Sequence, residues 1–385
     1  MLGILAINIG GFAGPVAAVL SPNLPTPGTF ADEAWFAFAL LVFEGKMRAL
    51  FSLLFGASLA LFIERANAAG KPGELLQMRR LGWLALFGYL HFLLLWWGDI
   101  LFAYALAGLA ALAFRHYPLK GLATGALLLF AGWHLALAAE SWPLARSEAQ
   151  VLAGTATPAA AAEYRAARAD AAERTAREMA AYRQGFAAQA AGKLQHHAAE
   201  PLDAALGTMG EIVPLMLLGI VLYRSGFFSG KWPRPALRWL AVGGIGGGGA
   251  LTLAFIAWAW PLHFPPVLMN LAFASGLAIP HLLMMLGYAA ALMLAAPRLA
   301  ETRLGGRLIA AGRMAFSNYL GMTVVMTFIF YGWGLGLVGT VPPRWQGLFV
   351  LGGWALMLGW SKPWLARFRQ GPLEWVWRSL TYWRF

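Results

Sequence analysis

The sequence predicts an all-α fold, a polytopic membrane helical bundle of about ten transmembrane helices with an extracytoplasmic helical insertion. Hydrophobic residues make up 60% of the 385 residues and charged residues only 12%, whereas soluble domains carry roughly 25% charged residues. Apolar runs of about 20 residues recur along the chain, which is the length that a helix needs to cross the hydrocarbon core. A β-barrel would show shorter segments of alternating polarity.

The charge pattern and the composition exclude several classes of partner and site. The net charge is +12, but most basic residues lie in short loops that alternate along the chain, which is typical of the positive-inside rule. We therefore expect membrane lipid as a partner and no nucleic acid. The chain has no cysteine, and it lacks a zinc-binding HExxH motif, a P-loop and a dinucleotide fingerprint. We expect no metal and no bound cofactor.

The first five spans follow from hydrophobicity and loop charge. The loop 21–33 is rich in proline and has no basic residue, so we place it outside. The segment 34–64 would be about 45 Å long as one helix, so we expect an interfacial piece followed by span two. No basic residues precede the first span, so we expect an uncleaved helix whose cytoplasmic lead-in is missing from the sequence. The predicted spans are 1–20, 34–64, 81–97, 99–114 and 121–139.

The second half repeats this pattern after an unusual segment. Residues 140–202 are rich in alanine, have basic and acidic residues in near balance and show helical spacing. We interpret them as the extracytoplasmic insertion, long enough to escape the charge rule. The GGIGGGG stretch at 243–249 is expected to let helices approach closely. The later spans are 205–223, 239–260, 269–296, 314–337 and one that ends near Trp360. The predicted divisions are 1–139, 140–202, 203–361 and a basic aromatic tail, 362–385, that anchors at the inner interface.

Polar groups that share the outer half of the bilayer form the first candidate site. His91 and Asp99 are the predicted catalytic pair, with the carboxylate fixing the tautomer of a histidine base. The residues expected to bind substrate around them are Asn8, Glu44, Lys46, Arg48 and Glu211. A charge inside the membrane costs about 2.5–3.5 kcal/mol near a helix centre. Each charged side chain among these residues therefore needs a partner, a water-filled cavity or a position near the membrane interface.

Structural alternatives stay open for the same residues. Glu44 and Arg48 have the i,i+4 spacing of a helix salt bridge, and Lys46 can extend to the outer headgroups. Asp99 can cap the span that follows it, and His91 can make a structural bond between helices. We interpret His134, next to Trp133, as an interfacial residue.

The stretch GRMAFSNYLG at 312–321 gives a second candidate site, on the inner side. It brings Arg313, Asn318 and Tyr319 to the start of span nine, and a cytoplasmic pocket for an anionic, phosphate-bearing group with Arg313 as its clamp is one interpretation. Ordinary helix packing by small and polar residues is the other.

Five stretches in both halves resemble one family. They are LGILAINI (2–9), FEGKMRALFSLLFGA (43–57), RRLGWLALFGYLHFLLLWWGDILFAYALAG (79–108), GRMAFSNYL (312–320) and GPLEWVWRSLTY (371–382). In this order they resemble the YeiB family of bacterial membrane proteins of unknown function. The insertion contributes nothing to the resemblance, and the Asp–x–x–Arg–Gly sequence with which the family normally begins is absent.

That family is similar to a superfamily of transmembrane acyltransferases, which includes the lysosomal heparan-α-glucosaminide N-acetyltransferase. The resemblance implies transfer of an acyl group from a cytoplasmic donor, with acyl-CoA as co-substrate, to an extracytoplasmic hydroxyl or amine of a small molecule or glycan. Asn8 matches the functional asparagine of the heparan enzyme. The histidine that follows that asparagine has no counterpart in 21–33, so His91 would have to replace it from another helix.

Two further functions remain open. One is a transporter or exporter of a small amphipathic solute, with the charged groups as its polar pathway, and the other is a structural membrane protein whose charges are all paired. We expect the protein in the bacterial inner membrane, with several passes and both termini in the cytoplasm. The sequence leaves the oligomeric state open, a homodimer included.

Overall fold

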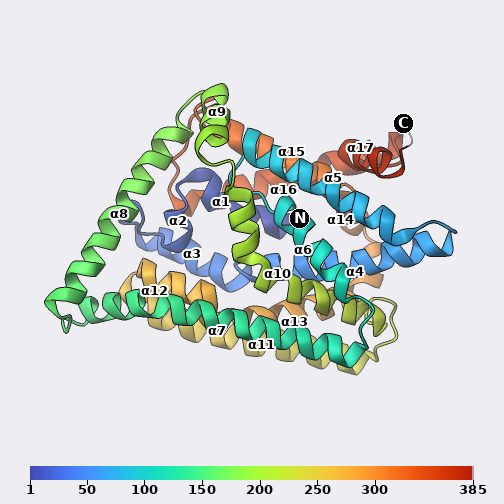
Figure 1. Ribbon diagram of the computed structural model, residues 1–385, viewed down its shortest axis with the longest axis horizontal. Coiled ribbons are helices and arrows are strands. Elements are labelled where there is room, and N and C mark those ends of the chain that lie inside the picture. The colour runs from blue at the N-terminus through green and yellow to red at the C-terminus, as the bar shows by residue number, and fades with distance from the viewer. Residues whose placement is uncertain (384–385) are drawn as a thin grey trace.

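A computed structural model describes residues 1–383, and within that range the fold is helical without β-strands (Figure 1). The all-α prediction is confirmed. The N-terminal helices are α1 (Leu2–Ala13), α2 (Ala17–Leu20), α3 (Phe30–Val42), α4 (Lys46–Ala68), α5 (Gly73–Leu94), α6 (Leu101–Phe114) and α7 (Leu119–Leu152). They are followed by α8 (Pro158–Tyr182), α9 (Phe186–His196), α10 (Glu200–Arg224), α11 (Arg234–Ala259), α12 (Pro266–Leu271), α13 (Ala278–Ala300), α14 (Arg303–Arg313), α15 (Ala315–Phe330), α16 (Pro343–Arg367) and α17 (Pro372–Tyr382).

The lengths and surfaces of these helices fit a membrane protein. Within the described residues, five segments are long and apolar enough to cross a membrane, namely Phe30–Ala68, Leu119–Leu152, Glu200–Arg224, Arg234–Leu262 and Ala278–Ala300. Many large apolar side chains lie exposed on the surface. Among them, Trp239 is 75% exposed and Leu135 is 70% exposed. Such a surface is unfavourable in water and favourable in hydrocarbon. The count of about ten spans stays a prediction.

Three predicted spans are interrupted. The span at 269–296 is divided into α12, a π-helical stretch at Ala272–Gly276 and α13. The span at 1–20 was expected to be continuous, but α1 ends at Ala13 because Gly14 is extended and Pro15 follows it. The segment 34–64 divides as predicted: α3 ends at Val42 and α4 begins at Lys46, with Gly45 at φ +71° between them. The expected boundary at 139/140 falls inside α7, which continues to Leu152.

Glycines set the closest helix crossings. A Cβ atom on Gly56 of α4 would lie 2.0 Å from the carbonyl oxygen of Met216, and one on Gly219 of α10 would lie 1.9 Å from that of Leu53. The two helices therefore meet backbone to backbone. The predicted glycine packing of α11 is also present, because Gly244 lies against α13 in the same way.

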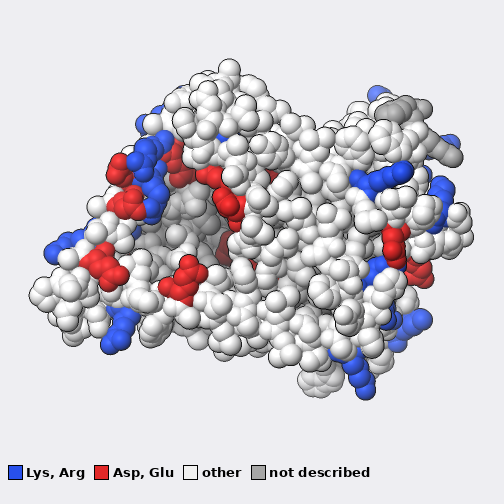
Figure 2. All heavy atoms as spheres, viewed as in Figure 1, with Lys and Arg blue, Asp and Glu red and all other residues white. Residues whose placement is uncertain are grey.

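The predicted insertion is helical and forms an arch. Helix α8 leaves the end of α7 and stands apart from the bundle (Figure 1), and Figure 2 shows the surface hollowed beside it, with charged side chains on the rim. Its far end is fastened to the bundle. The Glu178 carboxylate accepts a bond from Val16 N at 3.0 Å, and the Tyr182 ring stacks on Tyr331 at 4.7 Å between centroids.

The α4–α10 crossing generates a stability prediction. Gly219→Ala places a methyl group on a carbonyl oxygen, so we expect a loss of about 1–3 kcal/mol and a lower midpoint of thermal unfolding in detergent. The matched control is Gly247→Ala on α11, where a Cβ meets nothing within 4 Å. We expect that variant to be neutral or more stable, by up to about 1 kcal/mol, from helix propensity. Equal midpoints for the two variants would contradict the backbone contact.

Candidate functional site

His91 and Asp99 are joined in the structure. His91 lies in the last turn of α5, Asp99 lies in the turn before α6, and the His91 Nδ1 to Asp99 Oδ1 distance is 2.8 Å. Both side chains are buried, at 0% and 3% exposed. The second oxygen, Asp99 Oδ2, accepts a bond from Phe102 N at 2.8 Å. The predicted contact between His91 and Asp99 and the predicted capping of α6 by Asp99 are therefore both present. Each uses a different oxygen of the Asp99 carboxylate.

The other imidazole nitrogen faces a hydroxyl on a third helix. His91 Nε2 lies 3.0 Å from Thr323 Oγ1 of α15. This contact is the structural bond between helices that was the alternative prediction for His91. The Tyr319 ring packs against the imidazole at 5.2 Å between centroids, and within residues 1–383 its buried hydroxyl has no hydrogen-bond partner. A carboxylate, an imidazole and a hydroxyl in this order have the connectivity of a hydrolase triad.

A narrow slot runs beside this group, between α1, α15 and α16. Asn8 and Thr323 line it, and the rest of its wall is mostly apolar, with Ile4, Leu5 and Met322. Its volume is about 20 Å³, which is room for about one water molecule. A larger molecule therefore needs the slot to widen.

The insertion closes the site from the other side. Lys193 of α9 donates to Phe92 O at 2.9 Å, one residue from His91. Trp96 stacks on Phe12 at 4.0 Å and donates to Gly11 O at 3.4 Å. In this conformation His91 is 2% exposed, so neither it nor Asp99 reaches an open pocket.

The charges around Gly45 form a separate group. Arg48 pairs with Glu211 of α10 at 2.9 Å and not with Glu44, so the predicted i,i+4 bridge is wrong, because Glu44 lies before the helix begins. Extension of Lys46 to the headgroups is also wrong. Its side chain is 0% exposed, and its ammonium donates to Leu40 O at 2.5 Å.

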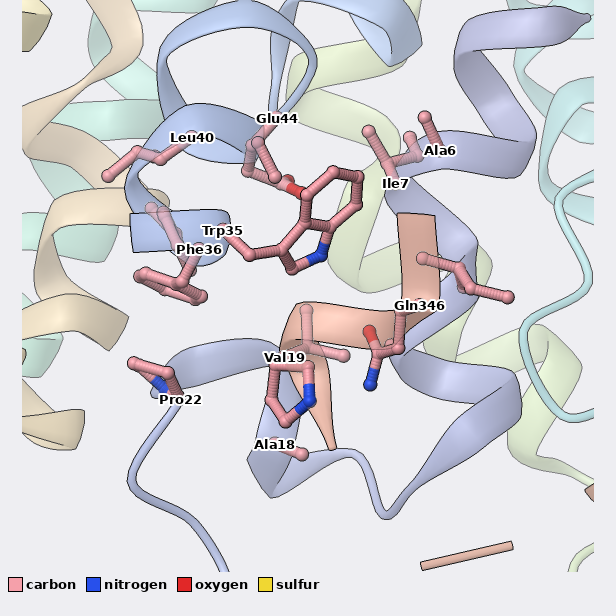
Figure 3. Close-up of a pocket in the computed structure, with 15 residues that line it drawn as sticks. Ala6, Ile7, Ala18, Val19, Pro22, Trp35, Phe36, Leu40, Glu44 and Gln346 are labelled. Atoms are coloured by element: carbon pink, nitrogen blue, oxygen red, sulfur yellow. The ribbon is translucent and has the colours of Figure 1, made fainter. Parts of the chain in front are cut away.

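Glu44 faces a second cavity, of about 70 Å³, between α1, α2, α3 and α16. Figure 3 shows its carboxyl group beside the Trp35 indole, with the Gln346 amide on another wall. One carboxyl oxygen accepts a bond from Gly45 N at 3.2 Å. Glu44 therefore lines a different cavity from Asn8 and Thr323.

Two buried histidines extend the charged group. His134 is 8% exposed and donates from Nδ1 to Ala274 O at 2.5 Å, so its interpretation as an interfacial residue is wrong. His281 of α13 packs against Gly45, where a Cβ would lie 2.0 Å from its ring. Within residues 1–383 neither Nε2 has a partner, and both side chains line a small cavity with Glu211. His281 was missed, although a histidine after proline in an apolar span was the available signal.

Of the three predicted inner residues, Asn318 and Tyr319 line the same narrow slot as Asn8 and Thr323, whereas Arg313 does not. Arg313 is exposed and donates to Arg369 O at 2.9 Å. Asn318 is buried and joins three helices, since it donates to Ala311 O at 3.0 Å and accepts from Trp360 Nε1 at 2.8 Å. This arrangement fits the packing alternative.

The tail docks on the start of α15, through a contact that the sequence analysis did not predict. Glu374 of α17 accepts bonds from Phe316 N at 2.7 Å and Ser317 N at 3.0 Å, so it caps α15.

Comparison with known proteins identifies the family. A family model described as "Protein of unknown function (DUF418)" matches residues 222–384. The uncharacterized protein YeiB of Escherichia coli (strain K12) is 30% identical over 389 residues, covering 99% of this chain and 93% of its own. The chain belongs to the YeiB family.

A second YeiB-type relative, the uncharacterized protein YxaH of Bacillus subtilis (strain 168), is 31% identical over 395 residues, covering 99% of this chain and 91% of its own. No solved structure matches the chain. The names of these YeiB-family relatives state no activity.

The contact between α9 and α5 generates a pH prediction. Burial lowers the pKa of Lys193 from 10.5 to about 8, opposed by the nearby Glu200 charge. Between about pH 8 and 10.5 the unfolded chain therefore holds the proton that the folded chain has lost, so stability rises with pH in that window. We expect the midpoint of thermal unfolding to show this rise in the wild type and to lose it in Lys193→Met. Lys120→Met, at an exposed position, is the control, and a rise that survives in Lys193→Met would contradict the assignment.

Proposed function

We propose that this YeiB-family protein is a transmembrane acyltransferase of the bacterial inner membrane, with both termini in the cytoplasm. It takes an acyl group from acyl-CoA on the cytoplasmic side and gives it to a hydroxyl or amine of a small molecule or glycan on the other side. The observation that carries the proposal is the buried Asp99–His91–Thr323 relay beside an apolar slot.

The relay has the groups that acyl transfer needs. The Asp99 carboxylate holds the proton on His91 Nδ1, which leaves the lone pair on Nε2 to act as a base. Burial strengthens the attraction between the carboxylate and the imidazolium that forms when the base takes a proton. This is the arrangement for activating a hydroxyl nucleophile.

The slot suits the acyl group. If the slot widened, its wall of Ile4, Leu5 and Met322 would bury a hydrocarbon chain, and two side-chain amides line it, Asn8 on α1 and Asn318 on α15. An amide donor can stabilise the oxygen of a carbonyl under attack. The resemblance to transmembrane acyltransferases supports the same role for Asn8.

Transport of a small amphipathic solute is the second candidate, and a different observation favours it. The polar path inside the apolar bundle consists of the fully buried Lys46, the Arg48–Glu211 pair, and His134 and His281, whose Nε2 atoms have no hydrogen-bond partner within residues 1–383. Ionisable groups at such depth mark solute and proton pathways in membrane proteins.

Conservative variants of the pair test the enzyme. His91→Gln keeps a hydrogen-bonding side chain but removes the base, and Asp99→Asn keeps an oxygen for Phe102 N but removes the charge. We expect each to lower transfer of labelled acyl groups to added acceptors by about 100-fold or more, while donor binding in lipid nanodiscs persists. His197→Gln, at a histidine that is 51% exposed in the insertion, is the control.

The opposite results would favour transport. Wild-type protein that binds no acyl-CoA, together with solute flux in sealed vesicles that Lys46→Met abolishes, would overturn the enzyme proposal. Acyl transfer that His91→Gln leaves unchanged would remove the relay from the mechanism.

A further inference from the structure

The position of Thr323 limits what His91 can deprotonate. The free imidazole nitrogen, Nε2, lies 3.0 Å from Thr323 Oγ1, and His91 is not among the residues that line the slot. Thr323 does line it, although it is 1% exposed. An acceptor in the slot therefore meets Thr323 before it meets the base. The hydroxyl that the base reaches is the protein's own.

Other buried threonines show that this contact is unusual. Thr252 and Thr327 donate to the carbonyl four residues earlier, at 2.8 and 2.7 Å, and have no imidazole neighbour, which is the ordinary behaviour of a helical threonine. The equivalent bond from Thr323 to Tyr319 O is longer, at 3.2 Å. Since Asp99 holds the proton on Nδ1, the shorter contact is the one in which Thr323 donates to Nε2.

We propose that Thr323 is the nucleophile and carries the acyl group as an ester between two half-reactions. This inference rests on the proposed acyltransferase function. In the first half-reaction Thr323 Oγ attacks the thioester carbonyl and its proton passes to His91 Nε2. The C–S bond breaks, and the thiolate takes the proton and leaves as the thiol. In the second, the acceptor oxygen or nitrogen attacks the Thr323 ester and loses a proton to His91, which returns it to Thr323 Oγ as the C–O bond breaks.

Two separate half-reactions need less widening of the slot than direct transfer does. At about 20 Å³ it has room for neither donor nor acceptor, so either molecule needs it to widen, and direct transfer would need it to widen for both at once. A covalent relay needs each molecule only in turn. It also lets the acyl group change sides while the charged donor stays where it binds.

The test looks for the ester itself. Purified wild-type protein in nanodiscs is mixed with isotope-labelled acetyl-CoA or palmitoyl-CoA without acceptor, quenched rapidly in acid and digested for mass spectrometry. We expect label on the peptide that contains Thr323, its loss in Thr323→Val and His91→Gln, and its return in Thr323→Ser. Thr327→Val, which removes a buried hydroxyl one turn along the same helix, is the matched control and should keep the label.

Turnover separates this inference from the function on which it rests. We expect Thr323→Val to lower transfer to acceptor by about 100-fold or more, with Thr323→Ser retaining most of it. Transfer at the wild-type rate in Thr323→Val, combined with loss in His91→Gln, would overturn the covalent step and leave the acyltransferase standing. Wild-type protein that neither binds nor consumes either donor would overturn both.

Discussion

The carboxylate of Asp99 couples the fold to the candidate site. One oxygen holds His91 at the end of α5, and the other accepts the bond from Phe102 N in the first turn of α6. The approach is tight, since a Cβ on Gly88 would lie 2.8 Å from the same carboxylate and 2.3 Å from Phe102 N. The Asp99 side chain therefore fixes three features: the turn between α5 and α6, the tautomer of the His91 imidazole and the direction of its Nε2. None of these can change without the others.

The same rule, a carboxylate shared between elements, recurs through the bundle. Glu33 of α3 accepts from Trp260 at 2.9 Å and pairs with His263 at 2.8 Å, and Asp32 pairs with Arg344 at 2.7 Å. Glu374 fastens α17 to α15. In an apolar bundle without water a buried polar group needs a partner from another helix. These acidic residues therefore connect separate helices.

Apolar periodicity and loop charge predict the helices well, because a segment in lipid has to satisfy its backbone locally. They also predict that His91 and Asp99 meet, since the two lie eight residues apart across a tight turn. Pairings over long sequence distances were beyond this reasoning. Arg48 finds Glu211 163 residues away, whereas the i,i+4 spacing with Glu44 assumed a helix that in fact begins at Lys46. The hydroxyl of Thr323 had no sequence signal at all.

The attachment of α1 to its neighbours explains how so closed a site can admit a substrate. Helix α1 (Leu2–Ala13) ends at Gly14, whose backbone is extended. Within residues 1–383, three hydrogen bonds from other helices or loops hold α1. They run from Trp354 Nε1 to Leu2 O at 2.9 Å, from Trp96 Nε1 to Gly11 O at 3.4 Å and from Gly339 N to Ala13 O at 2.8 Å. Asn8 lies between these ties and has no such bond of its own among the described residues. A small displacement of α1 would therefore widen the slot at Asn8 and Thr323 while leaving the Asp99–His91 pair, which is held by α5 and α6, in place.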